Sequence, residues 1–333
     1  MGNSASAPPT SAEAFGPTTT AEQVADVFAA EAPGKVVLIT GANTGLGLET
    51  ARVLSAKGAS VVIACRSTDK GEAAVASIVQ AHPEAKVSFL QLDLASLASI
   101  RSFAAAFSAN YERLDILINN AGVMACPKST TTDGLETQFG VNHVGHFYLT
   151  KLLLPALLWT GKAGTPARVV NLSSMAQYIY APDEGIRFDD LGGDKSYYEW
   201  ERYGQAKLAN VLFSTELNRR YQDQHVISIA LHPGAILSTE LSRYMGISAT
   251  VRGISSLRSG MFTRVVREPM KSIPQGAATT LVAALRPDIV PGGYYADGQV
   301  STELHPRALD LDIAKKLWEV TETIVNEIEA KLP

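Results

Sequence analysis

Short apolar runs alternate with longer amphipathic segments from residue 35 onward. Six runs of six or seven residues are nearly continuous in apolar side chains, as expected of strands buried on both faces: 35–40, 60–65, 86–92, 114–119, 167–172 and 226–231. Between most of them lie segments with helical periodicity, such as 45–57 and 96–109. Such repeated units predict an α/β fold, with a single doubly wound (Rossmann-type) parallel sheet and helices on both faces.

The same pattern divides the chain. Residues 1–34, which begin with a stretch rich in Ser, Thr, Ala and Pro, predict a flexible N-terminal leader. Residues 35–333 show no linker and no repeat of fixed period, which predicts a single domain. Two segments depart from the strand and helix pattern. The insertion 177–200 mixes aromatic and acidic residues, and residues 241–272 form a basic amphipathic segment.

Composition narrows the class of protein. The 333 residues are 46% hydrophobic and carry a formal net charge of −4, without a run of like charges, so we expect no nucleic-acid partner. Two cysteines and the lack of a secretory signal predict a cytoplasmic protein. The longest apolar stretch, 147–159, is too short to span a bilayer and contains Lys151.

The first residues raise a question of membrane contact. The start "MGNSAS" matches the pattern for myristoylation of Gly2, although a disordered leader is an equal alternative. One acyl chain anchors weakly, and the first 34 residues contain four acids and no Lys, Arg or Cys. Any peripheral contact from this end is therefore weak and reversible.

Residues 241–272 are the candidate for a second membrane signal. They carry six basic residues against Glu268, with apolar residues at helical spacing: Ile254, Leu257, Met261 and Val265. This segment could rest on an anionic membrane surface. We favour the alternative, in which its apolar face packs on the core of the protein.

A glycine-rich turn joins the first predicted strand and helix. Gly41, Gly45 and Gly47 in "TGANTGLG" let the backbone approach a pyrophosphate, which the start of the helix stabilises. The next strand ends in Cys65 and Arg66, where an acid would select NAD. Since an arginine can pair with a 2′-phosphate, we expect NADP(H) to be preferred over NAD(H).

Seven motifs occur in order along the chain: "TGANTGLG", "LDLAS", "NNAG", "VNHVGHF", "NLSS", "YGQAK" and "HPG". With them the chain resembles the short-chain dehydrogenase/reductase family over nearly all of residues 35–300. The wording is most similar to the retinol dehydrogenase-like and WW-domain oxidoreductase-like branch, without a WW domain. The resemblance implies a classical catalytic set of Asn142, Ser174, Tyr203 and Lys207. It also implies a set of cofactor-binding residues: Gly41, Asn43, Thr44, Gly45, Leu46, Gly47, Arg66, Asp93, Leu94, Asn120, Ala121, Gly122, Tyr203, Lys207, Pro233, Gly234, Ser238 and Thr239.

The chemistry of the pair Tyr203 and Lys207 follows from their spacing. One helical turn apart, the ammonium can stabilise a tyrosinate, as an acid and base on an alcohol or carbonyl requires. By resemblance Lys207 also reaches the cofactor ribose, Ser174 binds the substrate oxygen, and Asn142 holds a water that relays the proton. The family favours Ser174 over the neighbouring Ser173. Either Ser238 or Thr239 could contact the nicotinamide.

Other residues near the motifs do not predict a catalytic or metal-binding role. His143, His146 and His232 lack the spacing of a metal site, so we predict no metal and interpret them as packing or supporting residues. Met175 and Phe147 are predicted to belong to the core. The pair Tyr198 and Arg202 repeats the spacing of Tyr203 and Lys207, and we expect it to play no part in the chemistry. The insertion either shapes the substrate entrance or is a long surface loop.

Together these features predict an NADP(H)-dependent oxidoreductase that interconverts an alcohol and a carbonyl on an apolar small molecule. Two alternatives stay open at this stage. One is a non-catalytic nucleotide-binding or scaffold protein on the same fold, and the other is an epimerase or dehydratase with the same Tyr and Lys pair. The sequence does not fix the substrate, the direction of reaction or the oligomeric state.

Overall fold

The computed structural model describes residues 15–236, 239–244, 253 and 269–332. The six predicted strands are present: β1 (Val36–Thr40), β2 (Ser60–Cys65), β3 (Lys86–Gln91), β4 (Ile116–Asn119), β5 (Ala167–Leu172) and β6 (Val226–His232). Two further strands were not predicted: β7 (Tyr294–Ala296) and β8 (Gln299–Val300). They are too short for any periodicity to show in the sequence.

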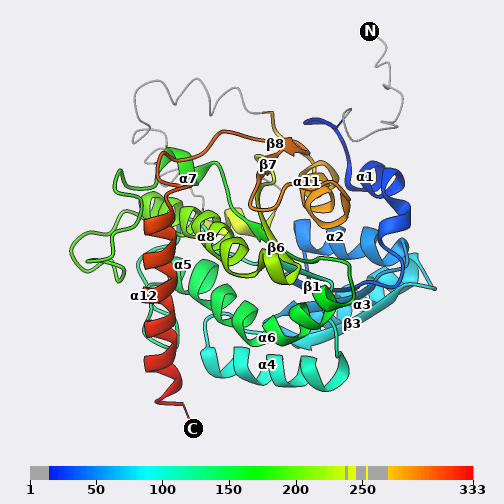
Figure 1. Cartoon of the computed structure of the whole chain (residues 1–333), viewed down its shortest axis with the longest axis horizontal. Helices are drawn as coiled ribbons and strands as arrows, with labels where there is room; N and C mark the ends of the chain where they lie inside the picture. The colour runs from blue at the N-terminus through cyan, green and yellow to red at the C-terminus, as the bar shows by residue number, and fades with distance from the viewer. Residues whose placement is uncertain (1–14, 237–238, 245–252, 254–268, 333) are drawn as a thin grey trace.

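These strands form one sheet in the order β3-β2-β1-β4-β5-β6-β7-β8 (Figure 1). Every neighbouring pair is parallel except β7 with β8. Because the order reverses between β1 and β4, the carboxyl ends of these strands frame the crevice in which such sheets bind ligands. The predicted α/β fold with a doubly wound sheet is confirmed.

Helices occupy the connections. Those described are α1 (Ala21–Val27), η2 (Ala29–Glu31), α2 (Gly45–Ala56), α3 (Thr68–Ala81), α4 (Leu97–Asn110), α5 (Thr137–Phe139), the π-helical turn η3 (Gly140–Val144), α6 (Gly145–Lys162), α7 (Ala176–Ile179), α8 (Glu199–Tyr221), η4 (Gln222–Gln224), η5 (Glu240–Tyr244), α11 (Ile273–Leu285) and α12 (Leu311–Glu329). Side-chain caps start several of them, as Ser67 does for α3 and Asp310 for α12.

Successive strand residues face two different cores. Leu38 belongs to the core shared with Phe107 of α4 and Trp318 of α12, where α6 and α8 also pack. Val37 and Ile39 belong to the other, which α1, α2, α3 and α11 cover. Figure 1 shows α12 beside α8 on one side of the molecule and α1 beside α11 and α2 on the other. This two-sided burial is why the strands read as unbroken apolar runs.

The N-terminal segment differs from its prediction. Residues 15–34, expected to be flexible, fold onto the domain: Phe15 and Val24 are buried in the core under α11 and α2. Thr20 and Gln23 form a reciprocal capping box at the start of α1. The expectation of a flexible leader is therefore wrong for residues 15–34. Gly2 lies outside the described residues, as does most of the basic segment 241–272, including Ile254, Leu257, Met261 and Val265.

Candidate active site

A cavity of about 900 Å³ opens at the carboxyl ends of the parallel strands. Every described residue that the sequence assigned to the cofactor lines it: Gly41, Asn43, Thr44, Gly45, Leu46, Gly47, Arg66, Asp93, Leu94, Asn120, Ala121, Gly122, Tyr203, Lys207, Pro233, Gly234 and Thr239. Ser238 lies outside the described residues. Ser174 also lines the cavity, whereas the fully buried Asn142 lies behind its wall.

The glycines at the end of β1 are required by close packing. Gly41 has a φ of 67°, and a Cβ atom there would lie 2.9 Å from the Cα atom of Ala121. A Cβ atom on Gly47 would lie 2.6 Å from Nδ2 of Asn120. The side chain of Thr44 makes no capping hydrogen bond, which leaves the first amides of α2 available to an anionic group. The turn therefore fits a pyrophosphate.

Thr40, the last residue of β1, links this turn to the loop after β4. Its Oγ accepts hydrogen bonds from the backbone amides of Asn120 and Ala121, at 2.9 and 3.0 Å. Its own proton has two acceptors within reach, Nε2 of His146 at 2.9 Å and the Ile118 carbonyl at 3.4 Å. From these contacts we assign the tautomer of His146 with the proton on Nδ1, which donates to the Asn142 carbonyl at 3.0 Å.

The end of the cavity beside β2 is lined by cations. Arg66 is exposed there, and Lys70, on the first turn of α3, lines the same wall. Lys70 was not predicted from the sequence, although its position one turn beyond Arg66 would have suggested it. The Nζ atom of Lys70 lies 3.3 Å from a carboxylate oxygen of Glu240, across the opening from α3. On the neighbouring loop, Asp93 accepts from the amide of Ala95 at 2.9 Å.

Tyr203 and Ser174 meet at the middle of the cavity. The phenol of Tyr203 hydrogen-bonds the Ser174 side chain, and burial raises the pKa of Tyr203 to about 12. Ser173 differs, because its hydroxyl donates to the Lys207 carbonyl at 2.7 Å in the buried interior. Of the two serines, Ser174 is thus the one beside the tyrosine.

Lys207 is buried one turn further along α8. Its Nζ donates to the Leu172 carbonyl at 3.0 Å, at the end of β5. Burial lowers the pKa of Lys207 to about 8. The sequence suggested that this ammonium stabilises a tyrosinate. In the structure desolvation is the main cause acting on both groups, so it favours the neutral phenol and the neutral amine.

Asn142 lies in the π-helical turn before α6. Its side chain makes two hydrogen bonds with one residue: Oδ1 accepts from the Val123 amide at 2.8 Å, and Nδ2 donates to the Val123 carbonyl at 2.9 Å. The side chain is therefore used to hold the loop after β4. π-helical turns are frequent at functional sites, and this one brings the Asn142 amide to that loop.

Apolar side chains line the remaining part of the cavity. They include Met124, Met175, Ile179, Tyr180 and Trp200. Met175 was predicted to be a core residue, which is wrong, because it is half-buried and lines the cavity; Phe147 is in the core as predicted. Methionine has the same apolar character in either place, so sequence alone could not distinguish them. Trp200 ends the insertion, and the centre of its ring lies 5.1 Å from the centre of the Tyr180 ring.

Of the three histidines, His143 and His146 are buried and support the packing, whereas His232 lines the cavity. His143 is fully buried and bonds Thr321 at 3.0 Å, while His232 accepts from the Met175 amide at 3.3 Å. Within the described residues no group of three or more His, Cys, Asp or Glu is placed to hold a metal ion. Across the same residues, no helix combines the length and apolarity needed to cross a bilayer.

Comparisons with known proteins agree with this geometry. The family described as short chain dehydrogenase matches residues 35–184. Mouse retinol dehydrogenase 12 is 47% identical over 291 residues, which cover 87% of this chain and 85% of that protein. The chloroplastic short-chain dehydrogenase TIC 32 A of Brassica napus is 42% identical, with 94% of this chain and 95% of that protein covered.

A solved structure supports the same assignment. The crystal structure of an uncharacterised protein from Mycobacterium paratuberculosis is similar with a TM-score of 0.68 and 36% identity, covering 90% of this chain and 97% of that one. Together with the fold, these likenesses show that the chain belongs to the short-chain dehydrogenase family, as an oxidoreductase of alcohols and carbonyl compounds that is similar to the retinol dehydrogenases.

Proposed function

We propose that the protein is an NADP(H)-dependent oxidoreductase that interconverts an alcohol and a carbonyl on an apolar small molecule, with Tyr203 as acid and base. One observation carries the proposal. Tyr203, Ser174 and Lys207 line a single cavity whose walls are a glycine turn on one side and apolar side chains on the other. That arrangement suits a reaction between a dinucleotide and an apolar molecule.

The choice of NADP(H) rests on charge. Arg66 and Lys70 line the end of the cavity beside β2, where a ribose 2′-phosphate is read in such folds. Glu240, an acid on the same wall, is paired with Lys70. The two cations favour the phosphorylated cofactor. NADP(H), when bound, supplies or takes up the hydride.

The proton is the part of the reaction that the chain itself handles. Because the pKa of Tyr203 is raised to about 12, the phenol stays protonated at neutral pH and suits donation to a carbonyl oxygen. Ser174, bonded to the same phenol, can hold that oxygen. Lys207 in its charged form lowers the cost of the tyrosinate that is left. We keep Asn142 as the residue that holds a relay water, through its backbone carbonyl, since its side chain is engaged with Val123.

The substrate class follows from the apolar wall and from the relatives. Met124, Met175, Ile179, Tyr180 and Trp200 offer no charge to a substrate. The relatives named retinol dehydrogenases are named for an apolar alcohol. We therefore propose an apolar alcohol or carbonyl compound as substrate.

The test is NADPH oxidation against apolar aldehydes, ketones, retinoids and steroids. We expect turnover with at least one class, and Tyr203→Phe should abolish it while NADPH still binds. Tyr198→Phe, at the N-cap of the same helix, is the matched control, and it should keep most of the activity. Undiminished turnover by Tyr203→Phe would contradict the assignment, and turnover without net NADPH oxidation would favour an epimerase or dehydratase.

For localisation we propose a cytoplasmic protein with weak peripheral membrane contact. The proposal is supported by the start "MGNSAS" and by the basic residues of 241–272. Flotation with anionic liposomes tests it. Binding should decrease from the wild type to Gly2→Ala, and further when arginines of 241–272, such as Arg258 and Arg264, are changed to Glu. Equal binding by all three proteins would rule the contact out.

A further inference from the structure

The insertion 177–200 folds around one buried carboxylate. Asp190 accepts from the backbone amides of Asp194 at 2.7 Å, Lys195 at 3.1 Å and Ser196 at 3.4 Å. These contacts close residues 190–196 into a compact turn, here called the Asp190 turn. The hydrogen bond from the Lys195 amide, aided by Arg202, holds the pKa of Asp190 well below its usual range, so the group is ionised.

Arg202 supplies the opposite charge from the first turns of α8. Its Nη2 donates to the Asp190 carboxylate at 2.6 Å and to the Ser196 carbonyl at 2.5 Å, and its Nη1 donates to the Asp190 carbonyl at 2.5 Å. Its side chain is 1% exposed, so the pair is removed from water. Two nitrogens of one planar group thus reach both ends of the Asp190 turn, which a lysine cannot do.

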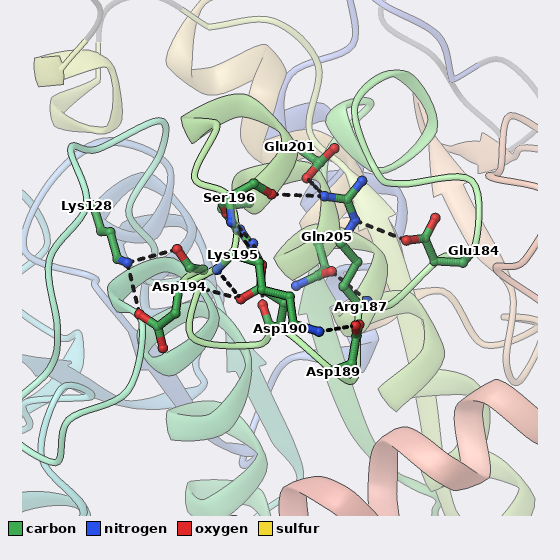
Figure 2. A network of polar contacts seen from close by, with 12 residues as sticks. Lys128, Glu184, Arg187, Asp189, Asp190, Asp194, Lys195, Ser196, Glu201 and Gln205 are labelled. Atoms are coloured by element: carbon green, nitrogen blue, oxygen red, sulfur yellow. Dashed lines mark hydrogen bonds and ion pairs between the residues drawn. The ribbon is translucent and has the colours of Figure 1, made fainter.

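Further polar contacts tie the insertion to its surroundings. The Tyr197 hydroxyl lies 2.9 Å from the Cys126 carbonyl, on the loop after β4. Gln138 donates to the Glu199 carbonyl at 2.9 Å. Figure 2 shows Lys128 reaching Asp194, and Arg187 between Glu184 and Glu201.

Two residues within two positions of Arg202 in sequence line the cavity. Trp200 is buried against the pocket wall, and its ring meets that of Tyr203 edge-on at 6.5 Å between centres. Tyr203 follows Arg202 directly. The insertion is therefore fixed at the point where the apolar wall meets the reacting phenol.

We propose that Arg202 is a positioning residue for substrate selection. By holding the Asp190 turn against α8, it fixes Trp200 as the wall on which a bulky apolar substrate packs beside Tyr203. The proposal rests on the proposed function, because it concerns the substrate of that same site. It also gives the insertion a role at the substrate entrance.

The arrangement predicts a selective defect. A short substrate reaches Tyr203 without contacting Trp200, whereas a long apolar chain must pack on it. We expect Arg202→Lys, which keeps the charge but loses the planar fork, to lower kcat/KM for decanal about tenfold or more, mainly through KM. For propanal the change should be less than twofold. The Kd of NADPH should not change, because Arg202 does not line the cavity.

The control is a second ion pair of the same insertion. Lys195 and Asp189 are 65% and 74% exposed, and such surface pairs contribute little. Lys195→Met should leave kcat/KM for both decanal and propanal unchanged. A double-mutant cycle with Trp200→Ala then distinguishes loss of positioning from a general loss of structure. In the Trp200→Ala background, Arg202→Lys should cause little further decrease in kcat/KM for decanal, because both changes remove the same wall.

A readout independent of turnover completes the test. With Trp159→Phe and Trp318→Phe, Trp200 is the remaining tryptophan of three. Adding Arg202→Lys should make its fluorescence clearly more accessible to acrylamide. Equal losses for both aldehydes, an additive cycle, or unchanged quenching would each overturn the role of Arg202. Failure of the wild type to reduce either aldehyde would instead count against the proposed function, and quenching would still decide whether Arg202 positions Trp200.

Discussion

The Nζ atom of Lys207 lies 5.7 Å from the centre of the Tyr203 ring, and its hydrogen bond goes to the Leu172 carbonyl at the end of β5. Lysine and tyrosine are thus neighbours on one helical face, yet the lysine is fastened to the sheet. Burial acts in opposite directions on them, raising the pKa of Tyr203 to about 12 and lowering that of Lys207 to about 8. The charge of Lys207 is therefore the one that changes near neutral pH.

This predicts a pH dependence of the reduction. Below about pH 8 Lys207 is protonated in the free protein, and above it the ammonium that favours tyrosinate and cofactor is lost. We expect kcat/KM for NADPH, which reports the free protein, to fall as the pH rises through about 8. Lys207→Arg keeps its charge, so its lower activity should show no such fall. A wild-type profile that stays level to pH 9.5 would contradict the prediction.

The position of Arg66 predicts a preference for NADPH over NADH. Arg66→Ala should raise the Kd of NADPH about ten- to hundredfold, since a charge-assisted hydrogen bond contributes about 1.5–3 kcal/mol, and should leave the Kd of NADH nearly unchanged. Lys70→Met should have a smaller effect, because Lys70 is exposed and shared with Glu240.

The matched control for these cofactor variants is Lys86→Met, because Lys86 pairs with Ser60 at the start of β3 and so lies at the end of the strands opposite Arg66. Fluorescence titration with both cofactors measures the effect. A parallel loss of NADH affinity in Arg66→Ala would show that Arg66 does not read the phosphate.

Much of this site could be predicted because buried strands and the glycine-rich turn have recognisable sequence patterns. Strands buried on two faces, such as β5, are unbroken apolar runs, and the glycine spacing of the turn is visible in the sequence. The atoms that exclude a side chain at Gly41 and Gly47 lie on Ala121 and Asn120, so the structure was needed to give the reason. The role of Arg202 could not be predicted. Its partner, Asp190, lies outside its own helix, and the spacing from Tyr198 suggested only a helical pair.

The N-terminal segment shows a second kind of limit. Its composition, rich in Ser, Thr and Pro, indicated flexibility, whereas Phe15 and Val24 are buried against the domain and the capping box of Thr20 and Gln23 starts α1. The capping pattern was present in the sequence and would have predicted α1. Composition averages over such positions, so it missed them.

The close packing around Gly47 predicts that a larger side chain at this position destabilises the turn. In Gly47→Ala the new methyl group would lie 2.6 Å from Nδ2 of Asn120 and 2.7 Å from the Gly41 carbonyl oxygen, so the turn must shift. We expect a loss of about 1–3 kcal/mol in the free energy of unfolding and at least a tenfold weaker binding of NADPH. Gly16→Ala is the control, because its methyl group meets no atom within 4 Å. Native-like stability and NADPH binding in Gly47→Ala would contradict the close packing of this turn.

The buried histidines predict sensitivity to acid. Burial lowers the pKa of His143 to about 3 and that of His146 to about 4, from an ordinary value of 6.5. Between these values the unfolded chain binds the protons first, so stability is lost as the pH falls from about 6.5 toward 3. Each histidine contributes a slope of about 1.4 kcal/mol per pH unit.

His143→Phe removes the contribution of one of these two histidines to the pH dependence of stability. The ring fits among Phe139, Phe147 and Phe213, and Thr321 keeps its bond to the Leu317 carbonyl. Urea unfolding at several pH values should then show a shallower loss of stability between pH 6 and 4. Thr321→Val, which keeps the buried imidazole and removes only its hydrogen bond, should retain the wild-type slope. If His143→Phe lost stability with pH as steeply as the wild type, His143 would have to be protonated inside the fold, and the neutral ring inferred from its burial would be wrong.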